Sequence, residues 1–200
     1  TLIAHLKSRA KEDTGYALLR ACRNRKSAIV EALINTGAAT DYININGETA
    51  LVHACRHVGT NSAEILIDAG AEVNHITQRG NSALIVACRY GHAKAVAKLL
   101  NKGVERNLKN NNGNTALMLA IKHGHTEAAV KLLEAGVDVN VTDHIGDTAL
   151  MIACRLPKKA QASTITLLIE AGAHVNVKND RGNTALMLAS QYGHIEAVSQ

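Results

Sequence analysis

Four cysteines recur at regular spacing, and thiols could bind a metal or form disulfides. They are Cys22, Cys55, Cys88 and Cys154, separated by 33, 33 and 66 residues. Such spacing places one thiol at the same position of successive packed helices, whose axes lie about 8–10 Å apart. A disulfide tolerates only about 7 Å between Cα atoms, and zinc needs ligands that converge on one point. We therefore expect free packing thiols in a reducing compartment, the cytoplasm or the nucleus.

Ten histidines form a second set of groups that could bind metals or transfer protons. None stands at a metal-binding spacing such as H-E-x-x-H. His92, His125 and His194 each follow a glycine at a helix–helix turn, so we expect them to be structural. No nucleophile elbow, phosphate loop, dinucleotide fingerprint or pair of carboxylates stands out. The residues predict no enzymatic activity, no cofactor and no metal.

A ladder of cations is the arrangement that best predicts binding. It consists of one cation in each of five successive segments: Arg23, Arg56, Arg89, Lys122 and Arg155. With helices about 10 Å apart, these cations would form a positive stripe about 40 Å long. Arginine binds carboxylates and phosphates through paired hydrogen bonds, so we expect the ladder to contact an acidic partner. The alternative is that its cations are solvated or pair with nearby carboxylates such as Glu48 or Asp147.

Two further groups of residues differ between segments and are candidates for contact with a partner. The positions after the ladder include His57, Tyr90, His123 and Tyr192. The turns include Ile45, Arg79, Asn112, Ile145 and Arg181. Ile45 and Ile145 are apolar where turns favour polar residues. They are therefore candidate anchors at an interface, or alternatively they cover neighbouring loops.

Two phased motifs indicate which elements position these residues. The string Gly-x-Thr/Ser-Ala-Leu begins at Gly47, Gly80, Gly113, Gly146 and Gly182, at intervals of 33, 33, 33 and 36 residues. A second series runs in step with it, at Gly37, Gly70, Gly103, Gly136 and Gly172. Two such series identify a tandem repeat.

The unit at 110–142 shows the local structure that the repeat predicts. Residues 110–113 are Asn-Asn-Asn-Gly, a turn sequence. Thr115 is positioned to cap a short helix over 116–123, and a second helix follows over 126–135. Neither helix is stable alone in water, so each must bury its apolar face against neighbouring units.

The composition fits regular stacking of similar helices. Aromatic residues make up only 2% of the chain, with no Trp and no Phe, so the core must be aliphatic. No stretch of about 18 apolar residues is present that could span a membrane. The net charge of +5 favours acidic partners without identifying one.

These motifs resemble the ankyrin repeat family, whose unit is a β-turn followed by two helices with a period of about 33 residues. The resemblance implies an all-α ankyrin-repeat solenoid of helix-turn-helix pairs, with β-turn fingers and inner helices lining a concave groove. It also implies that the ladder and the residues after it face this groove. The family's Thr-Pro-Leu-His box is altered, because its histidine is replaced by Val52, Ile85, Met118, Met151 or Met187. This change predicts purely apolar packing between repeats.

The repeat register predicts an ankyrin repeat domain at 11–200, after residues 1–10 as an N-terminal helix or the end of a preceding repeat. The repeats are 11–43, 44–76, 77–109, 110–142, 143–178 and 179–200. The fifth has three extra residues near 156–161, and the sixth is partial, which suggests a segment of a longer protein. Asn74 and Asn140 resemble ankyrin asparagines that become hydroxylated; alternatively, both bond the finger backbone.

Three functions follow as hypotheses. The favoured one is a non-catalytic scaffold for protein–protein interaction, whose basic groove and finger tips bind an acidic protein. The second is binding of nucleic acid or an oligonucleotide by the same cations, which the scarcity of aromatic side chains for base stacking disfavours. The third is a targeting or regulatory module of a larger enzyme or effector.

Overall fold

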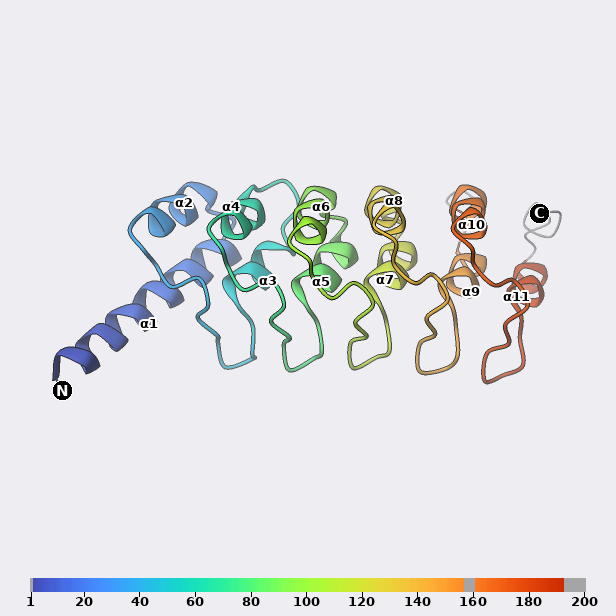
Figure 1. Cartoon of the computed structure of the whole chain (residues 1–200), viewed down its shortest axis with the longest axis horizontal. Helices are drawn as coiled ribbons and strands as arrows, with labels where there is room; N and C mark the ends of the chain where they lie inside the picture. The colour runs from blue at the N-terminus through green and yellow to red at the C-terminus, as the bar shows by residue number, and fades with distance from the viewer. Residues whose placement is uncertain (1, 157–160, 193–200) are drawn as a thin grey trace. The chain divides into compact units, whose positions relative to one another are not determined.

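Helices and loops make up the computed structural model, which describes residues 2–156 and 161–192 (Figure 1). No strand forms among these residues, although Thr142 and Thr148 make an isolated antiparallel bridge. The chain divides into two compact units, Thr1–Glu105 (unit 1) and Arg106–Gln200 (unit 2). The predicted all-α fold of helix-turn-helix pairs is confirmed.

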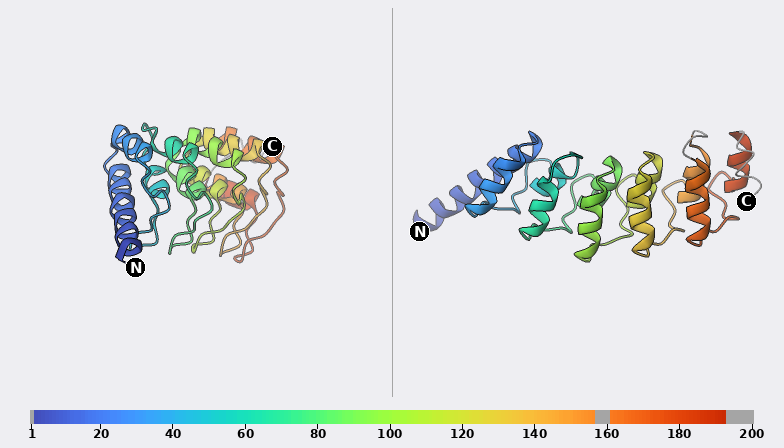
Figure 2. Two further views of the ribbon diagram at one scale, coloured as in Figure 1. Left: turned by 60° about the vertical axis from the view of Figure 1, so that its left-hand side comes forward. Right: turned by 90° about the horizontal axis from the view of Figure 1, so that it is seen from above.

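Unit 1 is built of pairs of helices joined by extended loops. The pairs are α1 (Leu2–Arg23) with α2 (Ser27–Asn35), α3 (Ala50–Ala54) with α4 (Ser62–Asp68), and α5 (Ala83–Tyr90) with α6 (Ala93–Asn101). The inner helices α1, α3 and α5 pack in one row, and the outer helices α2, α4 and α6 pack in a second row. Figure 2 shows the outer row from above and the fingers projecting from one side.

Unit 2 has the same arrangement. Its elements are α7 (Ala116–Lys122) with α8 (Thr126–Glu134), α9 (Ala149–Cys154) with α10 (Gln161–Glu170), and α11 (Ala185–Gln191). The inner helices α7, α9 and α11 pack in sequence. The predicted insertion lies largely outside the described residues, as do the outer helix of the sixth repeat and His194.

Hydroxyl caps start the short inner helices. The side chains of Thr49, Ser82, Thr115, Thr148 and Thr184 each accept a hydrogen bond of 3.3 Å from the amide three residues later. Such a bond satisfies an amide that the first turn of a helix leaves without a carbonyl partner. The helices expected over 116–123 and 126–135 are observed at 116–122 and 126–134.

The inner helices form an aliphatic core. Val52, Ile85, Met118 and Met151 are four of the five residues that replace the family's histidine, and each is only 1% exposed, so the predicted apolar packing is confirmed for these four. The fifth, Met187, is 52% exposed. The four cysteines are buried free thiols at equivalent positions of the repeats. Burial raises the pKa of Cys22 to about 12 and that of Cys154 to about 11, so these thiols stay neutral.

Helix α1 crosses the boundary predicted between residues 10 and 11. It runs without a break from Leu2 to Arg23, so residues 2–10 and the start of the first predicted repeat form one helix. Gly15 lies within this helix, and a Cβ added there would come within 2.4 Å of the Tyr42 Cβ. The glycine therefore allows the first finger to pack closely against α1 instead of ending the helix.

Polar contacts also join neighbouring repeats, which corrects the expectation of purely apolar packing between them. The Nε2 atom of His75 lies 2.7 Å from the carbonyl oxygen of Gly47 in the preceding finger. The Oδ1 atom of Asn140 accepts a hydrogen bond of 2.7 Å from the amide of His174. These bonds come from residues in the fingers and their flanks, outside the altered box.

Candidate functional site

The fingers hold their tips in place through the first side chain of each turn. In the finger at 44–47, Asn44 Oδ1 accepts hydrogen bonds of 2.9 Å from the amides of Asn46 and Glu48. Asn110, Asp143 and Asn179 make the same pair of bonds in their own fingers. Such local bonds hold the turn without help from the tip side chains. Ile45, at one tip, is 92% exposed.

In two repeats, the residue after the finger glycine is an acid that pairs with the ladder cation. Glu48 forms an ion pair with Arg56, eight residues later, and Asp147 forms one with Arg155 at the same separation. The alternative in which ladder cations pair with nearby carboxylates therefore holds for these two. The corresponding residue before Arg89 is Asn81, and before Lys122 it is Asn114, so neither position carries a charge.

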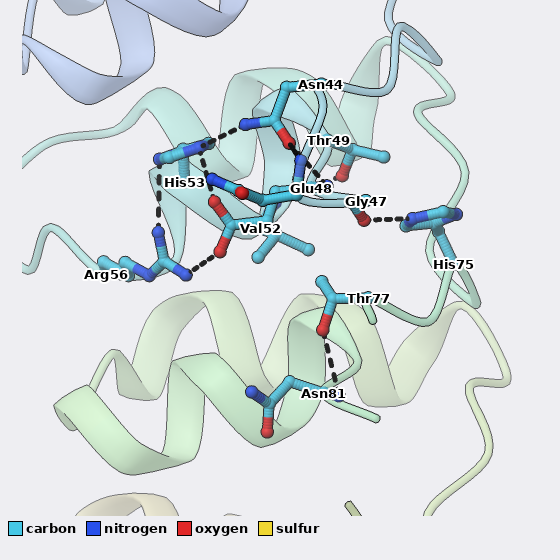
Figure 3. A network of polar contacts seen from close by, with 11 residues as sticks. Asn44, Gly47, Glu48, Thr49, Val52, His53, Arg56, His75, Thr77 and Asn81 are labelled. Carbon is cyan, nitrogen blue, oxygen red and sulfur yellow. Dashed lines mark hydrogen bonds and ion pairs between the residues drawn. The ribbon is translucent and has the colours of Figure 1, made fainter. Parts of the chain in front are cut away.

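Glu48 lies in a polar network with Arg56, His53 and Asn44 (Figure 3). Its Oε2 atom is 3.0 Å from His53 Nε2, and His53 Nδ1 is 3.3 Å from Arg56 Nη1. Burial lowers the pKa of His53, and Arg56 adds to this effect against the opposing charge of Glu48. His53 is therefore neutral at pH 7; its Nε2–H donates to Glu48, and its Nδ1 accepts from Arg56.

The same network keeps Glu48 ionised. Burial alone would raise the pKa of this carboxyl group, but the hydrogen bond and charge of Arg56, with His53 and Asn44, hold it below the usual value. The Arg56 side chain is 28% exposed. The guanidinium of Arg56 thus lies partly at the surface, and its contacts with Glu48 and His53 fix its orientation.

Asp147 is the buried counterpart of Glu48 in unit 2. Its side chain is 1% exposed, and its charge is balanced by Arg155, which donates from both Nη atoms. Asn179 Nδ2 adds a hydrogen bond of 2.7 Å from the next finger. A buried carboxylate needs such partners to offset its lost hydration. Arg155, predicted to contact a partner, therefore has a structural role.

A basic hollow of ≈ 550 Å³ opens in unit 1. It is lined by the fingers at 44–47 and 77–80, by residues that flank them, and by α5 and Arg56. Its charged side chains are Arg56, Arg79, Arg89 and Glu48, three cations against one carboxylate that is already paired. Arg79 is exposed and makes no ion pair with any residue that the structure describes. The guanidinium carbon of Arg89 lies 5.9 Å from the centre of the Tyr90 ring.

The hollow thus brings together four of the predicted site residues, Arg56, Arg79, Arg89 and Tyr90. Other predicted residues of unit 1 lie outside its lining. Arg23 is exposed at the end of α1, and His57 Nδ1 is buried without a hydrogen-bond partner among the described residues.

The predicted residues of unit 2 do not line this hollow. All but the half-buried Arg155 are exposed: Asn112, Lys122, His123, Ile145, Arg181 and Tyr192. The His123 ring stacks on that of His125, with 6.3 Å between ring centres. The predicted continuous stripe of cations over both units stays a prediction.

Sequence reasoning missed the amides that line the hollow beside the arginines. These amide side chains are those of Asn46, Gln78 and Asn81. The Nε2 atom of Gln78 also donates a hydrogen bond of 3.1 Å to the carbonyl oxygen of Ile45. A signal was present in the repeat register, since the position after the finger glycine holds an acid in two repeats and asparagine in three. Aligning Glu48 with Asn81 shows that the carboxylate that pairs with Arg56 has no counterpart in the register of Arg89.

The asparagines predicted as hydroxylation sites make bonds to the backbone of the next repeat. Asn140 Nδ2 donates a hydrogen bond of 3.1 Å to the carbonyl of Gly172, in addition to its bond with His174. Asn74 Oδ1 accepts one of 3.3 Å from the amide of Glu105. These contacts agree with the structural alternative for both residues, and their hydroxylation stays a prediction.

Residues 2–156 and 161–192 hold neither a helix that could span a membrane nor a cluster of side chains suited to a metal site. No helix within them is both long and apolar enough to cross a membrane. Within the same ranges, no group of three or more His, Cys, Asp or Glu side chains is arranged to hold a metal ion.

Comparisons with known proteins agree with this architecture. The family description "Ankyrin repeats (3 copies)" matches residues 2–77, 60–143 and 130–200. The crystal structure of EF0377, an ankyrin repeat protein, is 30% identical with a TM-score of 0.83, covering 92% of this chain and 96% of that one. An ankyrin repeat domain, ABAYE2397 from Acinetobacter baumannii AYE, is 32% identical with a TM-score of 0.84, covering 92% and 95%. No curated protein gives a significant match. By sequence and by structure, the chain belongs to the ankyrin repeat family.

Proposed function

We propose that this chain is a non-catalytic protein-binding scaffold whose basic hollow binds an acidic segment of a partner protein. Ankyrin repeats generally mediate protein–protein interaction. The observation that carries the finer proposal is the excess of arginine over carboxylate in the hollow. The free thiols support a location in the cytoplasm or the nucleus.

Each arginine of the hollow contributes in a different way. Arg79 extends from a finger tip and steers an approaching acidic group, since exposed charges act mainly on association. Arg89 lies next to Tyr90, whose ring offers contact area at low entropic cost. Arg56 pairs with Glu48, which offsets part of its charge, so Arg56 contributes the least to binding an anion.

Nucleic acid is a less suitable ligand for this hollow. Its cations would attract phosphates, but Tyr90 is the one aromatic side chain in the lining. Binding of single strands relies on successive aromatic platforms for base stacking. A role as a targeting or regulatory module of a larger protein is compatible with the proposal, because such a module also acts by binding.

A charge-reversal pair tests the proposal in cell lysate treated with nuclease. Arg79→Glu with Arg89→Glu changes the hollow, whereas Lys94→Glu with Lys102→Glu makes the same change in charge on exposed residues of the outer helix α6 and its end. We expect proteins captured by wild type to be lost by the hollow variant, by about tenfold or more, and retained by the α6 variant. Mass spectrometry identifies them.

The outcome that contradicts the proposal is retention of the same proteins by the wild type and the hollow variant. Equal circular dichroism of all three forms shows that folding is unaffected. If nuclease treatment alone releases the captured proteins, they were held through nucleic acid, which favours the second function.

A further inference from the structure

Three isoleucines are exposed on the two fingers that border the basic hollow. Ile45 is 92% exposed, Ile43 is 49% exposed and Ile76 is 50% exposed. Ile45 directly precedes Asn46, and Ile76 directly precedes Thr77, and both of these neighbours line the hollow. The fingers are joined by the bond from Gln78 to the Ile45 carbonyl. The basic hollow therefore has an apolar border.

At the positions of Ile45 and Ile76, apolar side chains occur in the fingers beside the hollow and not in later fingers, although Ile145 is an exposed apolar residue at a different position of its own finger. The positions equivalent to Ile45 in later repeats hold Gln78, Asn111, His144 and Asp180. Those equivalent to Ile43 and Ile76 hold Lys109, Thr142 and Lys178. The scaffold thus forms the same finger with polar or charged side chains at these positions.

The isoleucines contribute little to the fold that could explain them. The turn at Ile45 is held by the two bonds to Asn44 Oδ1, which do not involve the isoleucine side chain. At 92% exposure, this side chain buries almost nothing within unit 1. An aliphatic side chain that is exposed to water gains free energy when a ligand buries it. That gain is open to a ligand seated in the hollow.

We propose that the acidic segment bound by the hollow is amphipathic, with aliphatic or aromatic side chains that pack on Ile45 and Ile76 beside its acidic ones. This inference rests on the proposed function. Successive side chains of an extended segment point to opposite sides, so a segment that lies along the boundary can direct its acidic side chains into the hollow and its apolar ones onto the fingers. The residues that contribute most to binding at protein interfaces commonly combine apolar side chains with arginine.

Two labelled ten-residue peptides of equal charge test this inference on the full chain. One alternates Asp with Leu, and the other alternates Asp with Ser. Fluorescence anisotropy should give an affinity for the Asp–Leu peptide at least about tenfold higher than for the Asp–Ser peptide. The variant Ile45→Ser with Ile76→Ser should lose most of this preference while its affinity for the Asp–Ser peptide stays unchanged.

A matched control removes two other exposed apolar side chains of unit 1. Ile29 on α2 is 51% exposed and Val58 is 54% exposed, and neither lines the hollow. Ile29→Ser with Val58→Ser should keep the full preference for the Asp–Leu peptide. If this control also loses the preference, the placement on the fingers is wrong.

The remaining outcomes separate the inference from the proposed function. Equal affinity of wild type for both peptides overturns the apolar contribution and leaves acid binding by the hollow intact. Tighter binding of the Asp–Leu peptide that persists in the Ile45→Ser/Ile76→Ser variant overturns the assigned contact. If neither peptide binds, both the inference and the proposed function are contradicted.

Discussion

The cations of the ladder differ in the residue that stands eight positions before each of them. Where that residue is Glu48 or Asp147, it pairs with the arginine. Where it is Asn81, the charge of Arg89 is not matched by a carboxylate at that position. The same basic residue type thus has a structural role where an acid stands in this register, and we propose that it binds a ligand in the repeat of Asn81. Measuring the free energy of unfolding of single variants tests which cations have a structural role.

The paired and unpaired positions should respond differently to loss of charge. Arg155→Met leaves the buried carboxylate of Asp147 without its cation, so we expect a loss of about 3 kcal/mol in the free energy of unfolding. Lys122→Met removes an exposed cation in the preceding repeat and should change it by less than about 0.5 kcal/mol. Urea denaturation followed by circular dichroism measures both. Equal losses would show that the Asp147 pair has no special structural role.

Fingers are the elements that place the recognition residues, and their packing depends on glycine. Gly113 has a φ of +76°, and a Cβ added there would lie 2.6 Å from the amide nitrogen of His144 in the next finger. Gly136 has a similar φ of +73° but would meet no atom within 4 Å. Both positions would strain the backbone of a non-glycine residue, but only Gly113 lies close to the next finger. Comparing the two therefore distinguishes the cost of backbone strain from the cost of the close contact.

Alanine substitutions at these glycines test the finger packing. We expect Gly136→Ala to cost about 1 kcal/mol of unfolding free energy through its positive φ alone. Gly113→Ala should cost more, by about 1–2 kcal/mol, because the finger must shift away from His144. The comparison is made by urea denaturation. Identical costs at the two positions would contradict the close contact.

The elements were predictable from the sequence because their signals are local. The cap at Thr115 and the helices that follow it are set by residues within one repeat. The continuous helix α1 was not predicted, because the boundary at residue 11 came from the repeat register, which carries no information on where a helix begins. Arg56, Arg79, Arg89 and Tyr90 were predicted as contacts, but not that they line one hollow, since this depends on the spatial arrangement of two fingers and α5.

For the whole molecule, binding depends on how its net charge of +5 is distributed. Many basic side chains are exposed or paired singly, as Lys98 is with Asp68 on the outer helices of unit 1. In the basic hollow, by contrast, three arginines gather on one concave surface. The central claim is that the excess of arginine over carboxylate in this lining binds acidic protein segments.

The most direct test changes that charge in both directions and measures the affinity of the full chain for the Asp–Ser peptide by fluorescence anisotropy. Asn81→Asp places a carboxylate in the register that pairs Arg56 and Arg155, so it should weaken binding about tenfold by holding Arg89. Glu48→Gln removes the carboxylate that holds Arg56 and should strengthen binding. Asn114→Asp, the equivalent change outside the hollow, should have no effect. Unchanged affinity in both hollow variants, or a shift of both in the same direction, would contradict the claim.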